Sequence, residues 1–183
     1  MKKLLATAIL GLASLTALAG TATVEYSDVE GVNGAKNGAG YMVNWNENIT
    51  KNLDGGFQMS TAQTDGTNSV STRVEGSLTP KYNLGYATAY FKGSVGVKLN
   101  SQGSNEFYAV EPGVVIPLGY GFSTRLGYRY RAAFNSAIAD TTETARLGVT
   151  YAFTKKDALT VRFDRMRGDT NQNSWNFAYT RSF

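Results

Sequence analysis

The sequence of 183 residues contains no cysteine and no histidine, and it has only three prolines. Without cysteine, disulfides and thiolate metal sites are excluded. Without histidine, the chain lacks the usual general base of enzymes that hydrolyse esters or peptides. Its acidic residues match neither a calcium loop nor a catalytic carboxylate pair, and it has no glycine-rich phosphate loop. These absences indicate a protein that is not an enzyme and that needs no metal or other cofactor.

Long apolar runs are also missing after the first twenty residues, so no membrane-spanning helix is expected there. Residues 1–19 begin with Lys2 and Lys3, continue as an apolar run and end in a small-residue site at Ala19. This pattern is typical of a secretory signal peptide, and an uncleaved N-terminal anchor is the alternative. Cleavage leaves residues 20–183 as one domain and lowers the formal net charge from +4 to about +2. Such a small charge gives no support for nucleic-acid binding.

What the sequence does contain is alternation, and residues 174–183 show it most clearly. One parity of this stretch is aromatic, with Trp175, Phe177, Tyr179 and Phe183. The other parity is small and polar, with Asn176, Ala178, Thr180 and Ser182. A period of two places these sets on opposite faces of a strand. In a soluble protein the aromatic face would need a covering layer, whereas in a membrane barrel it faces lipid.

A terminal phenylalanine that closes such a strand resembles the C-terminal assembly signal of bacterial outer-membrane β-barrels. The resemblance implies that the four aromatic residues of this stretch are recognised by the barrel-assembly machinery. The chain departs from the usual signal at Arg181, which stands where an apolar residue is common.

The same alternation recurs in ten segments separated by turn-rich stretches. The expected strands are residues 22–29, 40–45, 53–62, 69–79, 84–99, 107–117, 122–134, 142–153, 158–167 and 174–183. An even number of strands places both termini at one end, as single-chain bacterial barrels require. The expected fold class is therefore all-β, an antiparallel transmembrane β-barrel of about ten strands. Eight or twelve strands remain possible, and a soluble β-sandwich is the alternative fold.

Connection lengths support this topology. With the termini in the periplasm, the connections after even-numbered strands should be short, and those after odd-numbered strands long and exposed. The expected short turns are residues 80–83, 118–121 and 154–157, with 46–52 as a longer exception. The expected long loops are residues 30–39, 100–106, 135–140 and 168–173. The faces of the fifth strand cannot be assigned from its pattern, and a bulge near Gly93 is considered there.

Charged residues lie on the polar parity of several expected strands, which is the parity that faces the barrel interior. The expected lumen residues are Arg73, Glu75, Glu111, Arg125, Arg129, Arg131, Arg146, Arg162 and Asp164. Glu25 belongs to the same parity, while the orientation of Lys92 and Lys98 stays open. The interior is therefore expected to be net positive. Counting from the short turns places Glu111, Arg129 and Arg146 close together at mid-height.

Two interpretations of this interior compete. In the first, arginines and glutamates form a network that fills a narrow lumen and neutralises its own charges. In the second, the surplus of arginine forms a positive constriction that selects anionic solutes. Electrostatics alone slightly favour the first interpretation. The surplus of arginine favours the second, because an unpaired guanidinium in a closed interior is costly unless water or an anion meets it.

Three motifs in the second half of the chain resemble the oligogalacturonate-specific porin family. They are Val-Glu-Pro-Gly at 110–113, Leu-Gly-Tyr-Arg-Tyr-Arg at 126–131 and Arg-Leu-Gly-Val-Thr-Tyr at 146–151, followed by the aromatic end. In that family, arginines inside a twelve-stranded barrel line a pore for acidic sugars. The resemblance covers residues 107–183 and implies the same role for Arg129, Arg131, Arg146 and Arg162. This chain is shorter than the members of that family.

The sequence thus predicts a porin-like channel for small solutes in the Gram-negative outer membrane, with a preference for anions. The alternative is a closed structural or surface-interaction barrel without transport. A third hypothesis, an enzyme that modifies lipid A or peptides, is disfavoured by the missing histidine. The expected partners are outer-membrane lipid and lipopolysaccharide, the barrel-assembly machinery and small anionic solutes, and no nucleic acid.

Overall fold

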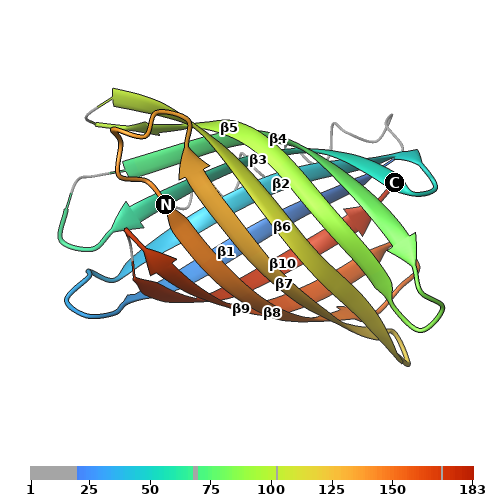
Figure 1. The fold of residues 1–183 in the computed structure, drawn as a ribbon. Coiled ribbons are helices and arrows are strands. Elements are labelled where there is room, and N and C mark those ends of the chain that lie inside the picture. Colours follow the sequence, from blue (N-terminus) through green and yellow to red (C-terminus); the bar gives the residue numbers. More distant parts are fainter. Residues whose placement is uncertain (1–19, 68–69, 102, 170) are drawn as a thin grey trace.

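Ten antiparallel strands form a closed barrel in the computed structural model, which describes residues 20–67, 70–101, 103–169 and 171–183 (Figure 1). The strands are β1 Thr21–Gly31, β2 Gly38–Thr50, β3 Leu53–Thr64, β4 Val70–Asn83, β5 Thr88–Asn100, β6 Gly103–Gly119, β7 Phe122–Ala133, β8 Thr142–Ala152, β9 Asp157–Gly168 and β10 Gln172–Ser182. The predicted fold class and strand number are confirmed. The signal peptide expected at residues 1–19 lies outside the described residues. No helix in the described ranges has the length and apolarity needed to cross a membrane.

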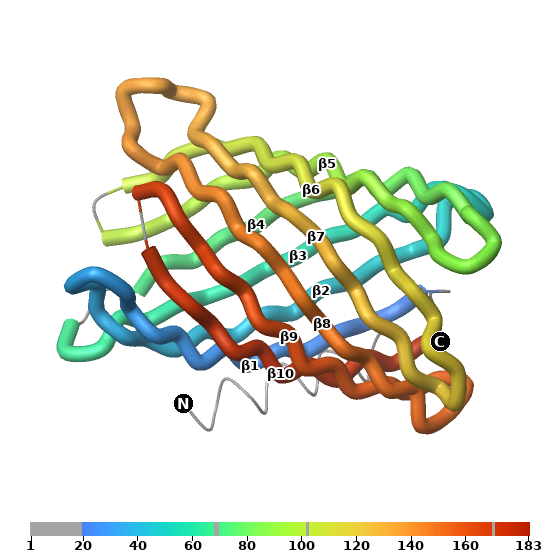
Figure 2. The backbone as a smooth tube through the Cα atoms, turned by 60° about the horizontal axis from the view of Figure 1, so that its bottom comes forward, coloured from blue at the N-terminus to red at the C-terminus, as the bar shows by residue number. Residues whose placement is uncertain are grey.

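Closure depends on the pairing of β1 with β10, which runs from Thr21 opposite Ser182 to Gly31 opposite Gln172. Every other strand pairs with its neighbours in the chain, so every strand is paired on both sides. The strands are tilted relative to the barrel axis (Figure 2), as closure of a sheet into a barrel requires. We call the end that carries the C-terminus and the connections after β2, β4, β6 and β8 the turn end. The opposite end is the loop end.

Three expected connections were wrong. Residues 80–83 belong to β4, where Lys81, Tyr82 and Asn83 pair with β5, and the turn follows at 84–87. The expected exception at 46–52 is a short turn, because β2 continues to Thr50. The expected loop at 100–106 is mostly strand, since β6 begins at Gly103. Strands extend through polar and turn-forming residues here because ladder hydrogen bonds join backbone groups and do not require apolar side chains.

The exterior face of the barrel is apolar. Large side chains on this parity are exposed on every side of the barrel, among them Phe57, Leu78, Phe91, Val95, Leu126, Leu147, Leu159 and Trp175. The opposite parity points inward and carries the charged and small polar residues. This arrangement is typical of a barrel whose outer wall contacts lipid.

The structure also settles the orientation of β5. Tyr90 points inward and is 8% exposed, whereas Phe91 and Val95 are exposed on the exterior. The register of β5 with both neighbours has no shift at Gly93, so the bulge considered there is absent from this described strand. The ring of Tyr90 fits because Gly113 carries no side chain. A Cβ at Gly113 would lie 2.3 Å from the Cζ atom of Tyr90.

We expect unheated protein to migrate differently from boiled protein in a denaturing gel. A closed ladder of backbone hydrogen bonds resists unfolding by detergent at room temperature. The measurement is gel migration with and without heating, and protein kept unfolded in urea serves as the control. Identical migration of the two samples, together with soluble expression, would contradict the barrel and favour the alternative fold, a soluble β-sandwich.

Candidate functional site

The predicted lumen residues all lie on the inward parity of their strands. Glu75, Glu111, Arg129, Arg131 and Asp164 are buried, with exposed fractions of 8% or less. Arg73, Arg146 and Arg162 are partly buried, and Arg125 is exposed to the interior cavity described below. Further residues that the sequence left open or missed also contribute charge to the interior: Lys92, Lys98, Asp140 and the ion pair of Lys81 with Asp54.

The first interior ion pair joins Glu75 on β4 to Arg129 on β7. The guanidinium donates to both carboxylate oxygens, with Nη1 3.3 Å from Oε1 and Nη2 2.7 Å from Oε2. Lys92 on β5 lies 3.4 Å from the same carboxylate. Because β5 and β6 separate β4 from β7, the pair spans part of the lumen and does not follow the wall.

A longer chain of ion pairs lies on the turn-end side of this pair and leads from β6 through β8 and β9 to β1. Glu111 accepts hydrogen bonds from Arg146 Nη1 at 2.5 Å and from the Tyr90 hydroxyl at 3.0 Å. Arg146 Nε lies 3.7 Å from Asp164, which also accepts from Arg162 Nε at 2.8 Å. The chain ends at Glu25 on β1, which accepts two hydrogen bonds from Arg162. The structure therefore joins Glu111 and Arg146 directly. Arg129 forms its ion pair with Glu75 and lies close enough for its charge to act on Glu111 as well.

A third cluster holds the β7–β8 loop against the barrel at the loop end. Asp140 of this loop is 4% exposed and accepts hydrogen bonds from Lys98 Nζ at 2.9 Å, Arg131 Nη2 at 2.8 Å and Asn105 Nδ2 at 3.0 Å. Burial acts to raise the pKa of Asp140, but the hydrogen bond from Lys98 and the charge of Arg131 outweigh it and lower the pKa below its ordinary value. This contact could not be predicted from the sequence, because Asp140 lies in a loop and its partners lie on three separate strands, β5, β6 and β7.

An interior cavity of about 450 Å³ extends from the ion pairs toward the turn end. The charged side chains along it include Glu25, Lys92, Glu111, Arg125, Arg146 and Arg162, and threonines line the part near the turns. The guanidinium of Arg125 lies over the ring of Tyr90, 5.1 Å from its centre. Within the described residues, no carboxylate forms an ion pair with Arg125.

Arg73 near the loop end is the other inward arginine without a carboxylate partner among the described residues. The charges that act on its guanidinium are those of two arginines, Arg131 and Arg129, and of two carboxylates, Asp140 and Glu75. Arg131 Nη1 is buried and has no hydrogen-bond partner in the described part of the chain. The interior thus contains the feature that each interpretation requires. Ion pairs at mid-height match the neutralising network, and the cationic groups without carboxylate partners toward either end match the positive constriction.

The four aromatic residues of the expected assembly signal lie along β10 and just after it. Trp175 and Phe177 are about half exposed on the exterior, and the ring of Phe183 stacks on Trp45 at a centroid distance of 5.9 Å. The Tyr179 hydroxyl donates to Asp157 at 2.6 Å, and Arg181 lies 3.5 Å from the same carboxylate. Arg181 is therefore accommodated by an ion pair at the turn end. The role of these residues in assembly stays a prediction.

No metal site is evident in the described ranges, where no three acidic side chains gather as ligands do.

No protein-family model and no curated protein sequence matches the chain. Several solved structures share its fold. An outer membrane channel from Pseudomonas putida F1 aligns over 91% of this chain and 96% of its own, with a TM-score of 0.60 and 12% identity. The KdgM porin aligns over 88% of this chain and 99% of its own, with a TM-score of 0.51 and 11% identity. The translocator domain of the autotransporter NalP from Neisseria meningitidis aligns over 100% of this chain and 98% of its own, with a TM-score of 0.51 and 12% identity.

These similarities show that the chain has the fold of outer-membrane β-barrels. The resemblance to porins of the KdgM type, drawn from the second half of the sequence, extends in the fold over most of the chain. At identities this low, the choice between transport and other functions depends on the lumen itself.

Proposed function

We propose that the protein is an outer-membrane channel for small solutes that prefers anions. On this proposal residues 1–19 direct export, and residues 20–183 span the membrane with the loop end outside the cell. The proposal depends chiefly on one observation, the polar interior cavity in which Arg125 is exposed and has no carboxylate partner among the described residues.

The physical argument concerns the charges that face this cavity. The inward cationic groups are Arg73, Lys81, Lys92, Lys98, Arg125, Arg129, Arg131, Arg146 and Arg162. The inward carboxylates with which they can pair are fewer: Glu25, Asp54, Glu75, Glu111, Asp140 and Asp164. A lumen with excess positive charge and low-dielectric walls attracts anions and repels cations. The ion pairs at mid-height narrow the lumen, which limits the proposed solutes to small ones.

The second candidate is a closed structural barrel without transport. The specific observations in its favour are the ion pairs that cross the lumen and the loop held by Asp140. If these contacts close the barrel completely, the cavity is a blind chamber at the turn end.

We expect the protein, refolded in planar lipid bilayers, to give a small anion-selective conductance. Removing the free charge in Arg125→Gln should lower the ratio of anion to cation permeability by about threefold, because one cationic group is lost from the ion path. The measurement is the reversal potential in a salt gradient. Arg181→Gln removes an equally charged side chain from the exterior rim and is the matched control.

A complete lack of current at all voltages would overturn the channel and favour the closed barrel. A cation-selective current, or a selectivity that Arg125→Gln and Arg181→Gln change equally, would overturn the role assigned to the lumen charge.

A further inference from the structure

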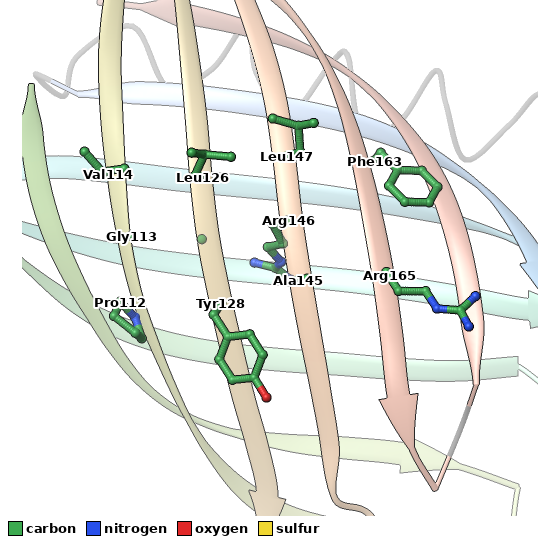
Figure 3. Close-up of a pocket in the computed structure, with 11 residues that line it drawn as sticks. Pro112, Gly113, Val114, Leu126, Tyr128, Ala145, Arg146, Leu147, Phe163 and Arg165 are labelled. Carbon is green, nitrogen blue, oxygen red and sulfur yellow. The ribbon is translucent and has the colours of Figure 1, made fainter.

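A groove of about 550 Å³ lies on the exterior wall of the barrel across β6 to β9 (Figure 3). Its floor is at Ala145, whose small side chain lies between the larger side chains of Tyr128 and Arg165 on the neighbouring strands. Val114, Leu126, Leu147 and Phe163 gather toward one end, and Tyr128 and Arg165 lie toward the other, which faces the loop end (Figure 3). The groove is therefore amphipathic along its length, and its charged end lies near the loops.

Arg165 is the unusual member of this wall. It lies on the exterior parity of β9, two residues after Phe163, and its register neighbours are Ala145 on β8 and Asn173 on β10. Asn173 on β10 accepts a hydrogen bond from Arg165 Nη1 at 2.6 Å and so fixes the guanidinium. Within the described residues, no carboxylate forms an ion pair with Arg165. Arg167, the other exterior arginine of this strand, lies opposite Glu143 in the register and has a nearby negative charge.

An exterior guanidinium at the edge of an apolar wall is stabilised by an anion at the level of the lipid headgroups. From Arg165 the groove extends along the exterior wall toward the apolar side chains at its other end. The two features together match an amphiphile with a negatively charged head and a hydrocarbon tail. Arg165 lies near the loop end of β9. An amphiphile whose head contacts Arg165 is therefore a lipid of the leaflet at the loop end.

We propose that this groove binds a phosphorylated glycolipid of the lipid A type. One acyl chain would lie over Ala145, which is opposite Tyr128 on β7 and Arg165 on β9, and would continue over Leu147. One phosphate would contact Arg165. The choice of a glycolipid over a phospholipid rests on the proposed placement of the barrel, with its loop end in the outer leaflet of the outer membrane. The occupancy of the groove itself does not depend on whether the lumen conducts.

The test measures binding of purified bisphosphorylated lipid A to the refolded barrel in detergent, by native mass spectrometry. We expect one tightly retained lipid per barrel. Arg165→Gln should weaken retention about tenfold, through loss of a charge-assisted contact to the phosphate. Ala145→Phe should weaken it comparably by filling the groove. Lipid A without phosphates should bind wild-type protein as weakly as the intact lipid binds Arg165→Gln.

Matched controls separate the groove from general effects on the barrel. Arg181→Gln removes an exterior arginine at the turn end, and Val95→Phe adds an exterior aromatic ring on β5, outside the groove. Heat-dependent gel migration confirms that every variant is folded.

Equal retention of lipid A by wild type, Arg165→Gln and Ala145→Phe would overturn the proposal. So would equally tight binding of phosphatidylglycerol, which would assign the groove to phospholipid. A dimer that Ala145→Phe disrupts would identify the groove as an interface between two barrels. Because no current is measured, failure of the channel proposal would leave these outcomes unchanged.

Discussion

Glu75→Gln is expected to lower the free energy of unfolding by about 3 kcal/mol, because it leaves Arg129 and Lys92 in a largely buried part of the interior without their carboxylate. The exposed fractions of Glu75 and Arg129 are 3% and 8%. Water can therefore replace the lost partner only in part. The measurement is urea-induced unfolding of the barrel in lipid vesicles, followed by tryptophan fluorescence.

Glu47→Gln is the matched control for this substitution. Glu47 is an exposed glutamate on β2 near the turn end, and no ion pair involving it is found in the described residues. Its replacement should change the free energy of unfolding by less than about 0.5 kcal/mol. The double variant Glu75→Gln with Arg129→Gln should recover part of the loss, because both members of the pair are then neutral. A loss for Glu75→Gln no larger than that for Glu47→Gln would contradict an energetic role for the pair.

Asp140→Asn is expected to raise the conductance of the channel several-fold. The substitution removes the negative charge that Lys98 and Arg131 share and so weakens the contact that holds the β7–β8 loop at the barrel mouth. This loop is the orange segment at the left of Figure 1. The measurement is single-channel conductance at neutral pH. Asp65→Asn, in the exposed connection between β3 and β4, is the control with the same change of charge.

The pH dependence of this contact follows from the lowered pKa of Asp140. A carboxylate with a lowered pKa in the folded protein contributes stability that is complete above its unfolded pKa of about 3.9. That contribution is lost as the pH falls through the lower, folded pKa. The wild-type conductance should therefore be the same at pH 7 and pH 5 and should rise only well below about pH 4. An unchanged conductance in Asp140→Asn and at acid pH would show that the loop does not restrict the lumen.

The fold and the lumen residues could be predicted from the sequence because both depend on parity. In a strand, alternate side chains point to opposite faces, so the exterior position of Trp175 and the interior position of Glu111 follow from counting residues. The failure at β5 has the same origin. Tyr90 and Phe91 are both aromatic, so alternation could not show which one points inward until Gly113 on β6 was found to leave room for the Tyr90 ring.

The boundaries between strands and loops were harder to predict from the sequence, for a different reason. Residues 80–83 and 103–106 are polar or contain proline and were expected to be connections, but they form strands. Composition reports how a side chain meets solvent, whereas a strand is defined by backbone pairing, which depends on how far the neighbouring strand extends.

The period of two is a local property of the backbone, so alternation along the chain was enough to predict strands with one apolar face and one polar, charged face. Which charges meet follows from the closed barrel. Glu75 and Arg129 lie on strands that are not neighbours, Asp140 reaches the lumen from a loop, and the exterior groove forms where side chains from four strands meet around Ala145. These contacts depend on the closure and stagger of the barrel, which no single strand encodes.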